Sequence, residues 1–238
     1  SIKGPFGHAI ALQFHDARIQ SSPHGEKIGT YGFIKDAPSF ISGATSNTQE
    51  GLLDFGYVFE YFILRLTQQG LGSVWLGGTF RRSQFHQDLM ENDIVPAITP
   101  VGYGKGQPAL RDKLIRNLAK GNQRIPASKL FFYQSFSTPW TMGEDRISQA
   151  LEMVRLAPSA SNKQPWRIVI IDEFAHFYLA RTPGYGRMLG FDIQMVDMGI
   201  ALCHLVLGLG LSIQQPDFFQ NNPNLKTDFL YITSIRWK

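Results

Sequence analysis

The sequence predicts a mixed fold of the α+β class that is built from two related halves. Short apolar runs of strand length alternate along the 238 residues with longer segments of helical periodicity. Two of the helical segments, which start at Asp54 and Asp197, share an Asp-x-Gly start and an apolar body. Each has a leucine eight residues after its glycine, Leu64 and Leu207, so the segments correspond at a constant offset of 143 positions. This similarity predicts two halves whose helices pack together at the centre of the molecule.

Composition places the chain among globular proteins with a large buried core. Hydrophobic residues make up 43% of the sequence and charged residues 18%, which excludes a disordered chain. The formal net charge is +4. The basic residues are scattered, however, and the densest cluster, Arg111 to Arg124, is interleaved with apolar residues. No continuous basic face is predicted, so we expect no nucleic-acid partner.

Several features predict a cytoplasmic protein without a membrane span. Cys203 is the only cysteine, so no intrachain disulfide can form, and a reducing compartment fits. The longest apolar stretch, Gly199 to Ile213, is shorter than the ~20 residues needed to cross a bilayer. The first residues, SIKGPFGHAI, lack the pattern of a signal peptide.

The N-terminal half is expected to hold strands around one central helix. Asp54 is predicted to cap the start of this helix, and Gly70 and Gly72 to end it. Its apolar residues recur on one face. Glu60 on this helix either binds a cofactor or makes an inter-helix hydrogen bond, and the sequence leaves both open. The expected strands are Ile10–Phe14, Ser39–Ser42 and Val95–Tyr103, the last restricted to a sheet edge by its two prolines.

The C-terminal half is expected to begin with an amphipathic helix and to contain the second central helix. Pro158 ends the first helix because the residue before proline leaves the helical region. The second helix, capped by Asp197, is apolar all around and therefore buried, with Cys203 and His204 as core residues. The expected elements are a helix over Ile147–Leu156 and strands over Arg167–Ile171, Phe177–Ala180 and Phe229–Ile235. The expected domains are 1–124, a linker over 125–143 and 144–238.

The stretch APSASNKQPW, residues 157–166, joins a helix to a strand with an unusual density of polar groups. Ser159 and Ser161 bring hydroxyls, while Asn162 and Gln164 each bring one acceptor and two donors. Such a loop can grip the polar edge of a flat heteroaromatic cofactor. It can equally satisfy its own backbone, and the residues alone do not decide between the two.

A second stretch, GLGSVWLGGTF at residues 70–80, follows the first central helix. Without a Cβ, Gly77 and Gly78 allow a backbone to pass close to a ligand and point amide groups at an acceptor. Neither a dinucleotide fingerprint nor a P-loop is present, and the histidines and the cysteine offer no metal-ligand spacing. No metal site is predicted.

Together, the APSASNKQPW loop, a helix that begins Asp-x-Gly and GLGSVWLGG resemble the FMN-dependent nitroreductase family. The similarity covers most of the chain and is strongest to the branch in which two nitroreductase-like halves lie in one polypeptide. It implies mixed and antiparallel sheets around central helices, and a pseudo-dimer within one monomeric chain. In this family FMN lies between the two halves of a dimer.

The resemblance also implies the cofactor-binding residues. The loop from one half packs on the flavin, the glycine turn faces its N5 and O4 edge, and basic residues hold the phosphate. Lys163 either lies near the ring, where a cation would raise its potential, or points to solvent. The implied set is Leu76, Gly77, Gly78, Lys120, Arg124, Pro158, Ser159, Ala160, Asn162, Lys163 and Gln164.

The chain departs from the family pattern in one element. The N-terminal Arg-x-Ser-x-Arg motif that holds the phosphate has no match, and the nearest residues, Arg81-Arg82-Ser83, follow the glycine turn. Only one loop and one glycine turn are present, which predicts one flavin per chain.

The resemblance implies an oxidoreductase that takes hydride from NAD(P)H and passes it through FMN to a nitroaromatic, a quinone or a similar acceptor. The cofactor does the redox chemistry, so no catalytic side chain is expected. Two alternatives remain: a different flavin reaction, such as reductive dehalogenation, and a non-catalytic flavin- or ligand-binding protein.

Overall fold

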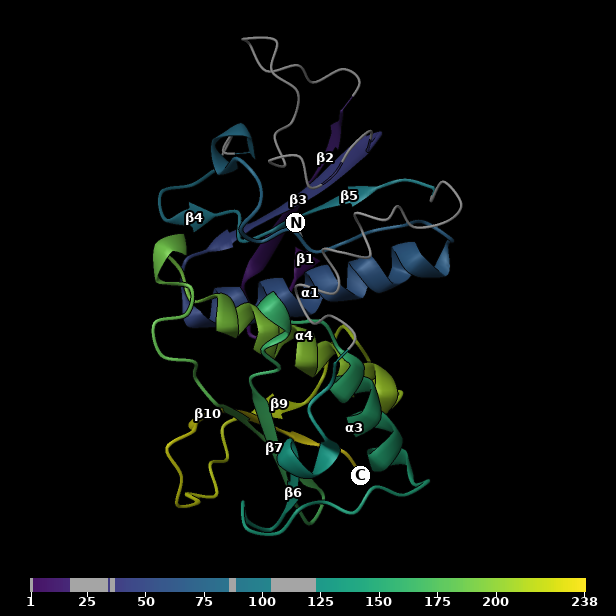
Figure 1. The fold of residues 1–238 in the computed structure, drawn as a ribbon, viewed down its shortest axis with the longest axis vertical. Coiled ribbons are helices and arrows are strands. Elements are labelled where there is room, and N and C mark those ends of the chain that lie inside the picture. The colour runs from purple at the N-terminus through teal and green to yellow at the C-terminus, as the bar shows by residue number, and fades with distance from the viewer. Residues whose placement is uncertain (1, 18–33, 35–36, 86–88, 104–122) are drawn as a thin grey trace.

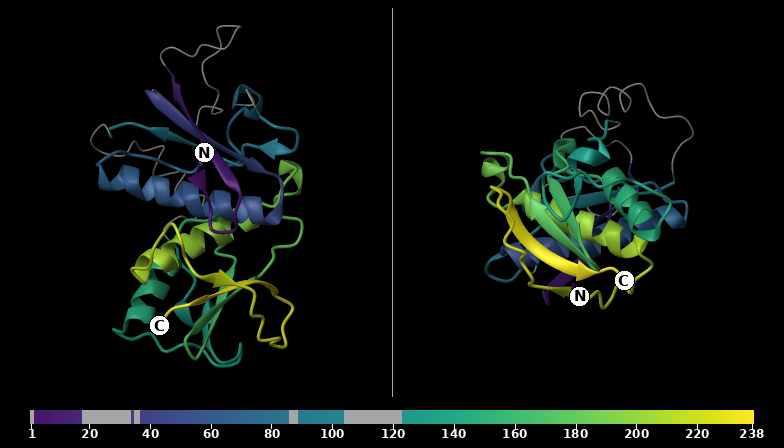
Figure 2. Two further views of the ribbon diagram at one scale, coloured as in Figure 1. Left: turned by 180° about the vertical axis from the view of Figure 1, so that it is seen from behind. Right: turned by 90° about the horizontal axis from the view of Figure 1, so that it is seen from below.

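Two β-sheets lie on either side of a pair of central helices (Figure 1). The computed structural model describes residues 2–17, 34, 37–85, 89–103 and 123–238. One sheet comes from the N-terminal part of the chain and the other from the C-terminal part, and the left view in Figure 2 shows them on opposite sides of the central helices. This is the mixed α+β architecture that the sequence predicts.

The first sheet is antiparallel throughout. Its central strand, β3, pairs with β2 along one side and with β5 and β4 along the other. The expected strands are confirmed in place, although β2 and β3 are longer and β5 is shorter than predicted. The strands are β1 (Ile2–Lys3), β2 (Ala9–Asp16), β3 (Ser39–Ser46), β4 (Asp93–Ile94) and β5 (Ile98–Val101), and the short 3-10 helix η1 (Arg82–Phe85) precedes β4 in the chain.

The first central helix, α1 (Gln49–Gln68), starts one turn earlier than the sequence analysis placed it. Thr48 is its N-cap, and the threonine side chain accepts a hydrogen bond from the amide of Gly51 at 3.0 Å. The prediction that Asp54 caps this helix is therefore wrong, since Asp54 lies inside it. The C-terminal end was predicted correctly: Gly70 adopts φ +76, and its amide donates to the Thr67 carbonyl.

The second central helix, α4 (Ile193–Gly208), shows the same displacement. Its N-cap is Asp192, whose side chain accepts from the amide of Gln194 at 3.1 Å, so the assignment of Asp197 as a cap is also wrong. The predicted burial on all sides is confirmed, because every residue from 193 to 206 is buried. Cys203 is fully buried, as expected.

The two central helices cross at a pair of glycines. A Cβ built on Gly56 would lie 2.1 Å from the carbonyl oxygen of Val196, and one built on Gly199 would lie 2.1 Å from the carbonyl oxygen of Leu53. The contact is reciprocal, since both partners in it are related by the 143-residue offset. Asn47 and Gly190, at the same offset, also meet: the asparagine amide donates to the glycine carbonyl at 3.2 Å. The helices therefore run in the same direction from their N-terminal ends.

The second sheet is mixed, with strand order β6-β7-β8-β10-β9. Only β6 and β7 are parallel, with Phe131 opposite Ile168. The segment 125–143, which the sequence analysis assigned to a linker, contains β6 and so contributes an edge strand to this sheet. The strands are β6 (Phe131–Tyr133), β7 (Trp166–Ile171), β8 (Phe174–Leu179), β9 (Phe218–Phe219) and β10 (Leu230–Arg236).

Helix α3 (Arg146–Leu156) packs beside α4 and ends where the proline predicts. Asp145 caps its start by accepting from the amide of Ser148 at 2.9 Å, and Ala157 ends it in an extended conformation. Gly208 of α4 allows the close approach, because a Cβ there would lie 2.6 Å from the Cα of Ala150. The remaining short 3-10 helices are η2 (Ala127–Lys129), η3 (Ala160–Asn162) and η4 (Arg187–Leu189).

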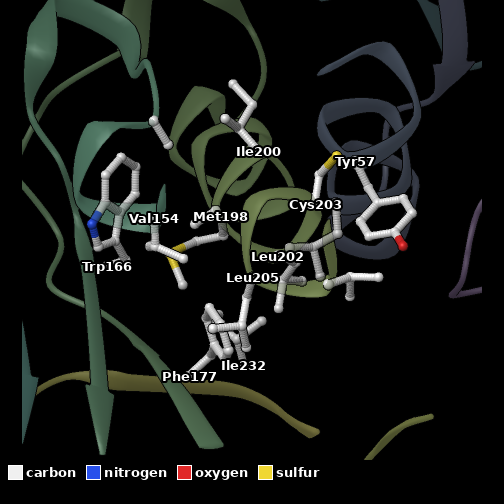
Figure 3. Packing of buried hydrophobic residues seen from close by; sticks show 14 of the residues in the cluster. Tyr57, Val154, Trp166, Phe177, Met198, Ile200, Leu202, Cys203, Leu205 and Ile232 are labelled. Carbon is white, nitrogen blue, oxygen red and sulfur yellow. The ribbon is translucent and has the colours of Figure 1, made fainter. Parts of the chain in front are cut away.

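One hydrophobic core joins the two sheets through α4. Figure 3 shows Trp166, Val154 and Met198 on one side of this helix and Tyr57 on the other side, next to Cys203. Trp166 at the end of the APSASNKQPW loop is fully buried. Within the described part of the chain, none of the helices is long and apolar enough to span a bilayer.

Candidate functional site

The loop over residues 158–164 has a strained backbone. Three of its non-glycine residues have left-handed conformations: Ser161 at φ 47, Asn162 at φ 54 and Gln164 at φ 48. Such conformations are uncommon for residues with a Cβ, and they persist only where surrounding contacts hold them. The strain therefore indicates that the surroundings select this loop shape.

Internal hydrogen bonds hold the loop in that shape. Gln164 is 2% exposed, its amide nitrogen donates to the Asn162 side chain at 3.0 Å, and its amide oxygen accepts from the backbone of Ile125 at 2.9 Å. The Asn162 side chain donates to the Gln123 carbonyl at 2.7 Å. For these two residues the structure shows the second of the two alternatives, in which the polar side chains bind the protein's own backbone. Their side chains fasten the loop to residues 123–125.

Arg124 belongs to the same network. Its guanidinium donates to the Leu156 carbonyl at 3.0 Å and to the side-chain oxygen of Asn162 at 3.2 Å. The cation thus lies at the end of α3 beside the loop. Lys120, the second residue predicted to hold the phosphate, lies outside the described residues.

Asp197 ties the loop to α4. One carboxylate oxygen accepts from the amide of Ala160 at 2.8 Å, and the other makes no hydrogen bond within the described part of the chain. The residue is 1% exposed, and burial raises the pKa of its carboxyl well above the usual range.

Asp54, which lies 143 positions before Asp197 in the sequence, makes similar contacts in the N-terminal part of the chain. Its two oxygens accept from the amides of Phe6 and His8, each at 2.8 Å. Burial raises the pKa of the Asp54 carboxyl to about 6, while the two amides act in the opposite direction. Both aspartates therefore anchor a distant backbone segment instead of capping their own helix.

The glycine turn lies against the start of α4. A Cβ on Gly77 would be 3.3 Å from the Cδ1 of Ile193, and one on Gly78 would be 4.0 Å from the Cδ2 of Leu189. Leu76, just before the turn, exchanges two backbone hydrogen bonds of 3.0 Å with Ile98. The guanidinium of Arg82 donates to the Gly77 carbonyl, so this arginine helps to fix the backbone of the turn.

Two neighbouring amides of this turn have no hydrogen-bond acceptor within the described structure. The N–H groups of Gly77 and Gly78 make no hydrogen bond within the described structure, and Gly78 is exposed. Adjacent donors of this kind, with room beside Gly78 where the nearest atom to a built Cβ is 4.0 Å away, suit the acceptor edge of a flat ring. The turn therefore fits the cofactor that the sequence resemblance implies.

The loop and the turn approach the same face of α4. Ile193, which contacts Gly77, and Asp197, which binds the amide of Ala160, are four positions apart and lie one above the other on the helix. The segment before α4 also contacts the loop, because the Tyr185 hydroxyl donates to the hydroxyl of Ser161 at 2.9 Å. Two stretches separated by about eighty positions in sequence thus meet one short piece of the molecule.

Lys163 is exposed and lies over the ring of Tyr185, with its Nζ 5.4 Å from the ring centre. A cation in this place interacts with the aromatic face and stays hydrated. Pro158 and Ser159 lead into the loop, and the Ser159 hydroxyl accepts from the amide of Gln164 at 2.9 Å.

Comparisons with known proteins identify the family of the chain. The family model described as "Putative TM nitroreductase" matches residues 11–209. The chain belongs to this family. It is a nitroreductase-family protein by sequence, and no curated protein is significantly similar to it.

One solved structure shares the fold of the chain, and a second matches part of it. A structure described as a putative nitroreductase from Thermotoga maritima superposes with a TM-score of 0.57 and 22% identity, covering 100% of this chain and 79% of that chain. A nitroreductase family protein from Clostridium difficile 630 gives a TM-score of 0.34 and 21% identity, covering 50% of this chain and 70% of that chain.

The sequence analysis of this nitroreductase-family chain overlooked three residues of the site. The Gln123 carbonyl accepts a hydrogen bond from the Asn162 side chain of the loop. Ile193 lies against Gly77 of the turn, and the Tyr185 hydroxyl connects the segment before α4 to the loop. A signal for Tyr185 was present, since it lies among closely spaced glycines, of which Gly184 and Gly186 have positive φ. No local signal marks Gln123 or Ile193, whose roles arise only from tertiary contacts.

Proposed function

We propose that this chain is an FMN-dependent oxidoreductase of nitroreductase type. Bound FMN would supply hydride transfer at N5, taking hydride from NAD(P)H and passing it to an electron-poor acceptor such as a nitroaromatic or a quinone. The observation that carries the proposal is the convergence of the strained loop and the glycine turn on the Ile193–Asp197 face of α4. Family membership adds independent support.

Each part of the proposed site has a separate task. The amides of Gly77 and Gly78 offer two donors to the acceptor edge of a flat ring. Asp197 and Gln164 hold the loop so that Pro158, Ser159 and Ala160 form a fixed wall on the other side. Arg124, with Lys120 from the adjoining segment, supplies positive charge for a phosphate. The residues thus bind and orient, and no side-chain acid or base is required.

The internal repeat suggests how the two parts of the proposed site come from two halves of the chain. We infer that residues 1–124 and 144–238 correspond to the two subunits of a dimeric relative, joined here in one chain. The reciprocal contact at Gly56 and Gly199 supports this, as does the matching use of Asp54 and Asp197. On this basis the flavin lies between the two halves, and a single chain is sufficient for activity.

The test is flavin binding followed by turnover. Purified chain is incubated with FMN, freed of excess cofactor, and examined by visible absorbance and then by NAD(P)H oxidation with a nitroaromatic acceptor. We expect bound flavin and acceptor-dependent oxidation. Binding without turnover would favour a non-catalytic flavin protein, and absence of binding would reject the proposal.

A glycine variant locates the flavin. In Gly78→Val the new side chain enters a space whose nearest protein atom is 4.0 Å from the Cβ, so the fold tolerates it while the ring edge is blocked. FMN affinity should fall by about tenfold or more, equivalent to about 1.4 kcal/mol. Ser73→Val, in the same extended segment but before the turn, is the matched control and should bind FMN as the wild type does.

A further inference from the structure

Three side chains, the buried Glu60 and His204 and the partly buried Trp75, connect the central helices to the segment before the Gly77–Gly78 turn. Glu60 of α1 is 2% exposed. One of its carboxylate oxygens accepts from the indole Nε1–H of Trp75 at 2.7 Å, and the other lies 2.8 Å from the Nε2 of His204 on α4. The sequence left two roles open for Glu60, and the structure shows the inter-helix hydrogen bond.

The geometry leaves little freedom to Trp75. Its indole nitrogen can only donate, and Glu60 is the acceptor that meets it. Its ring also packs edge-on against Phe59 and Phe55 of α1, with centroid separations of 5.0 and 6.1 Å. A hydrogen bond at one end of the ring and aromatic packing around it therefore fix both the position and the rotation of this side chain.

The fixed tryptophan is directly followed by the turn. Leu76, the next residue, pairs with Ile98 through two backbone hydrogen bonds, and Gly77 and Gly78 come after it. The direction of their amides depends on how this short extended segment leaves α1. Trp75 is its only large side chain anchored on that helix by a hydrogen bond within the described structure.

We propose that Glu60 is a positioning residue for Leu76 and the Gly77–Gly78 turn, acting through Trp75, with His204 as the second donor that keeps its carboxylate in place. Glu60 does not itself contact a ligand, because it is buried and both of its oxygens are used. A carboxylate in such a place is tolerated only when donors satisfy it, so the three residues depend on one another. The cofactor-binding consequence rests on the proposed function, whereas the effect on the turn does not.

Amide hydrogen exchange tests the effect on the turn without any cofactor. In Glu60→Leu, exchange at the amides of Leu76 and Ile98 should accelerate by about tenfold or more, because a hydrogen-bonded support is lost. The amide of Ile168, which donates to Leu130 in the other sheet, is the internal control and should not change. Glu60→Gln, which still accepts from the indole, should stay close to the wild type.

Trp75→Phe is the second variant, because it keeps an aromatic ring and removes only the donor. It should accelerate the same two amides, and its effect should not add to that of Glu60→Leu if both act through one hydrogen bond. Unchanged exchange at Leu76 and Ile98 in both variants, or equal acceleration at Ile168, would overturn the proposal.

FMN titration then tests the consequence for the cofactor. Where the wild type binds FMN, Glu60→Leu and Trp75→Phe should weaken it by about tenfold, and Glu60→Gln should restore most of the affinity. Equal affinity in all four proteins would show that the turn does not need this support. A wild type that binds no FMN rejects the proposed function, while the exchange measurement still decides on the role of Glu60.

Discussion

Asp54 shows how a single carboxyl can make stability depend on pH. Its side chain is buried and its pKa is raised to about 6 from an unfolded value of 3.8, mainly because burial disfavours the charge. The folded protein therefore holds this proton more tightly than the unfolded chain. The stability that Asp54 contributes is fully present below about pH 4 and is lost as the pH rises through about 6.

We predict that the free energy of unfolding of the wild type, measured by urea titration, falls relative to that of Asp54→Asn between about pH 4 and pH 6. The other groups with shifted pKa values, such as Asp197 (raised) and His176 (lowered), are common to both proteins and cancel in this difference. Asp228→Asn, which changes an exposed carboxyl, is the control and should behave as the wild type. An equal pH dependence in Asp54→Asn and the wild type would contradict the assignment.

At the scale of elements, the crossing of α1 and α4 depends on the absence of two side chains. We predict that Gly199→Ala lowers stability by about 3 kcal/mol or more, because its methyl group would meet backbone atoms of α1 that cannot move independently. Gly78→Ala adds the same methyl group where the nearest atom is 4.0 Å away and should change stability little. Thermal unfolding midpoints of the two variants measure this difference in stability. Similar midpoints would show that the two helices move apart without loss of stability and would contradict the prediction.

Helix positions were predicted from the sequence better than helix starts. The apolar periodicity located both central helices, but the Asp-x-Gly motif led to predicted starts that are four or five residues too late. The true caps, Thr48 and Asp192, carry the usual capping chemistry. The two aspartates instead reach backbone segments that are distant in sequence, which no local pattern can reveal.

Strand β6 shows the same limit for sheets. Phe131–Tyr133 is a short run in a segment rich in proline, serine and aromatic residues, which is typical of a linker. It becomes a strand because β7, more than thirty positions away, offers it a parallel partner. Contacts that distant in sequence, like the meeting of Gly77 with Ile193, depend on the complete fold.

At the scale of the whole molecule, the two halves that we propose differ at the position of the glycine turn. The positions offset by 143 from Gly77 and Gly78 are Gln220 and Asn221, and the Gln220 side chain is used to bind the Ile232 carbonyl at 3.0 Å. No second glycine turn lies there. We therefore predict that FMN titration saturates at one equivalent per chain, with chain concentration taken from amino-acid analysis; two tightly bound equivalents would contradict it.

The crossing at Gly56 and Gly199 has a consequence for behaviour on dilution. Both glycines belong to one polypeptide, so the local concentration of one helix around the other is set by the connecting chain and not by the amount of protein in the tube. Any activity that requires the paired helices should therefore stay constant per molecule down to nanomolar solutions, where a two-chain enzyme begins to fall apart.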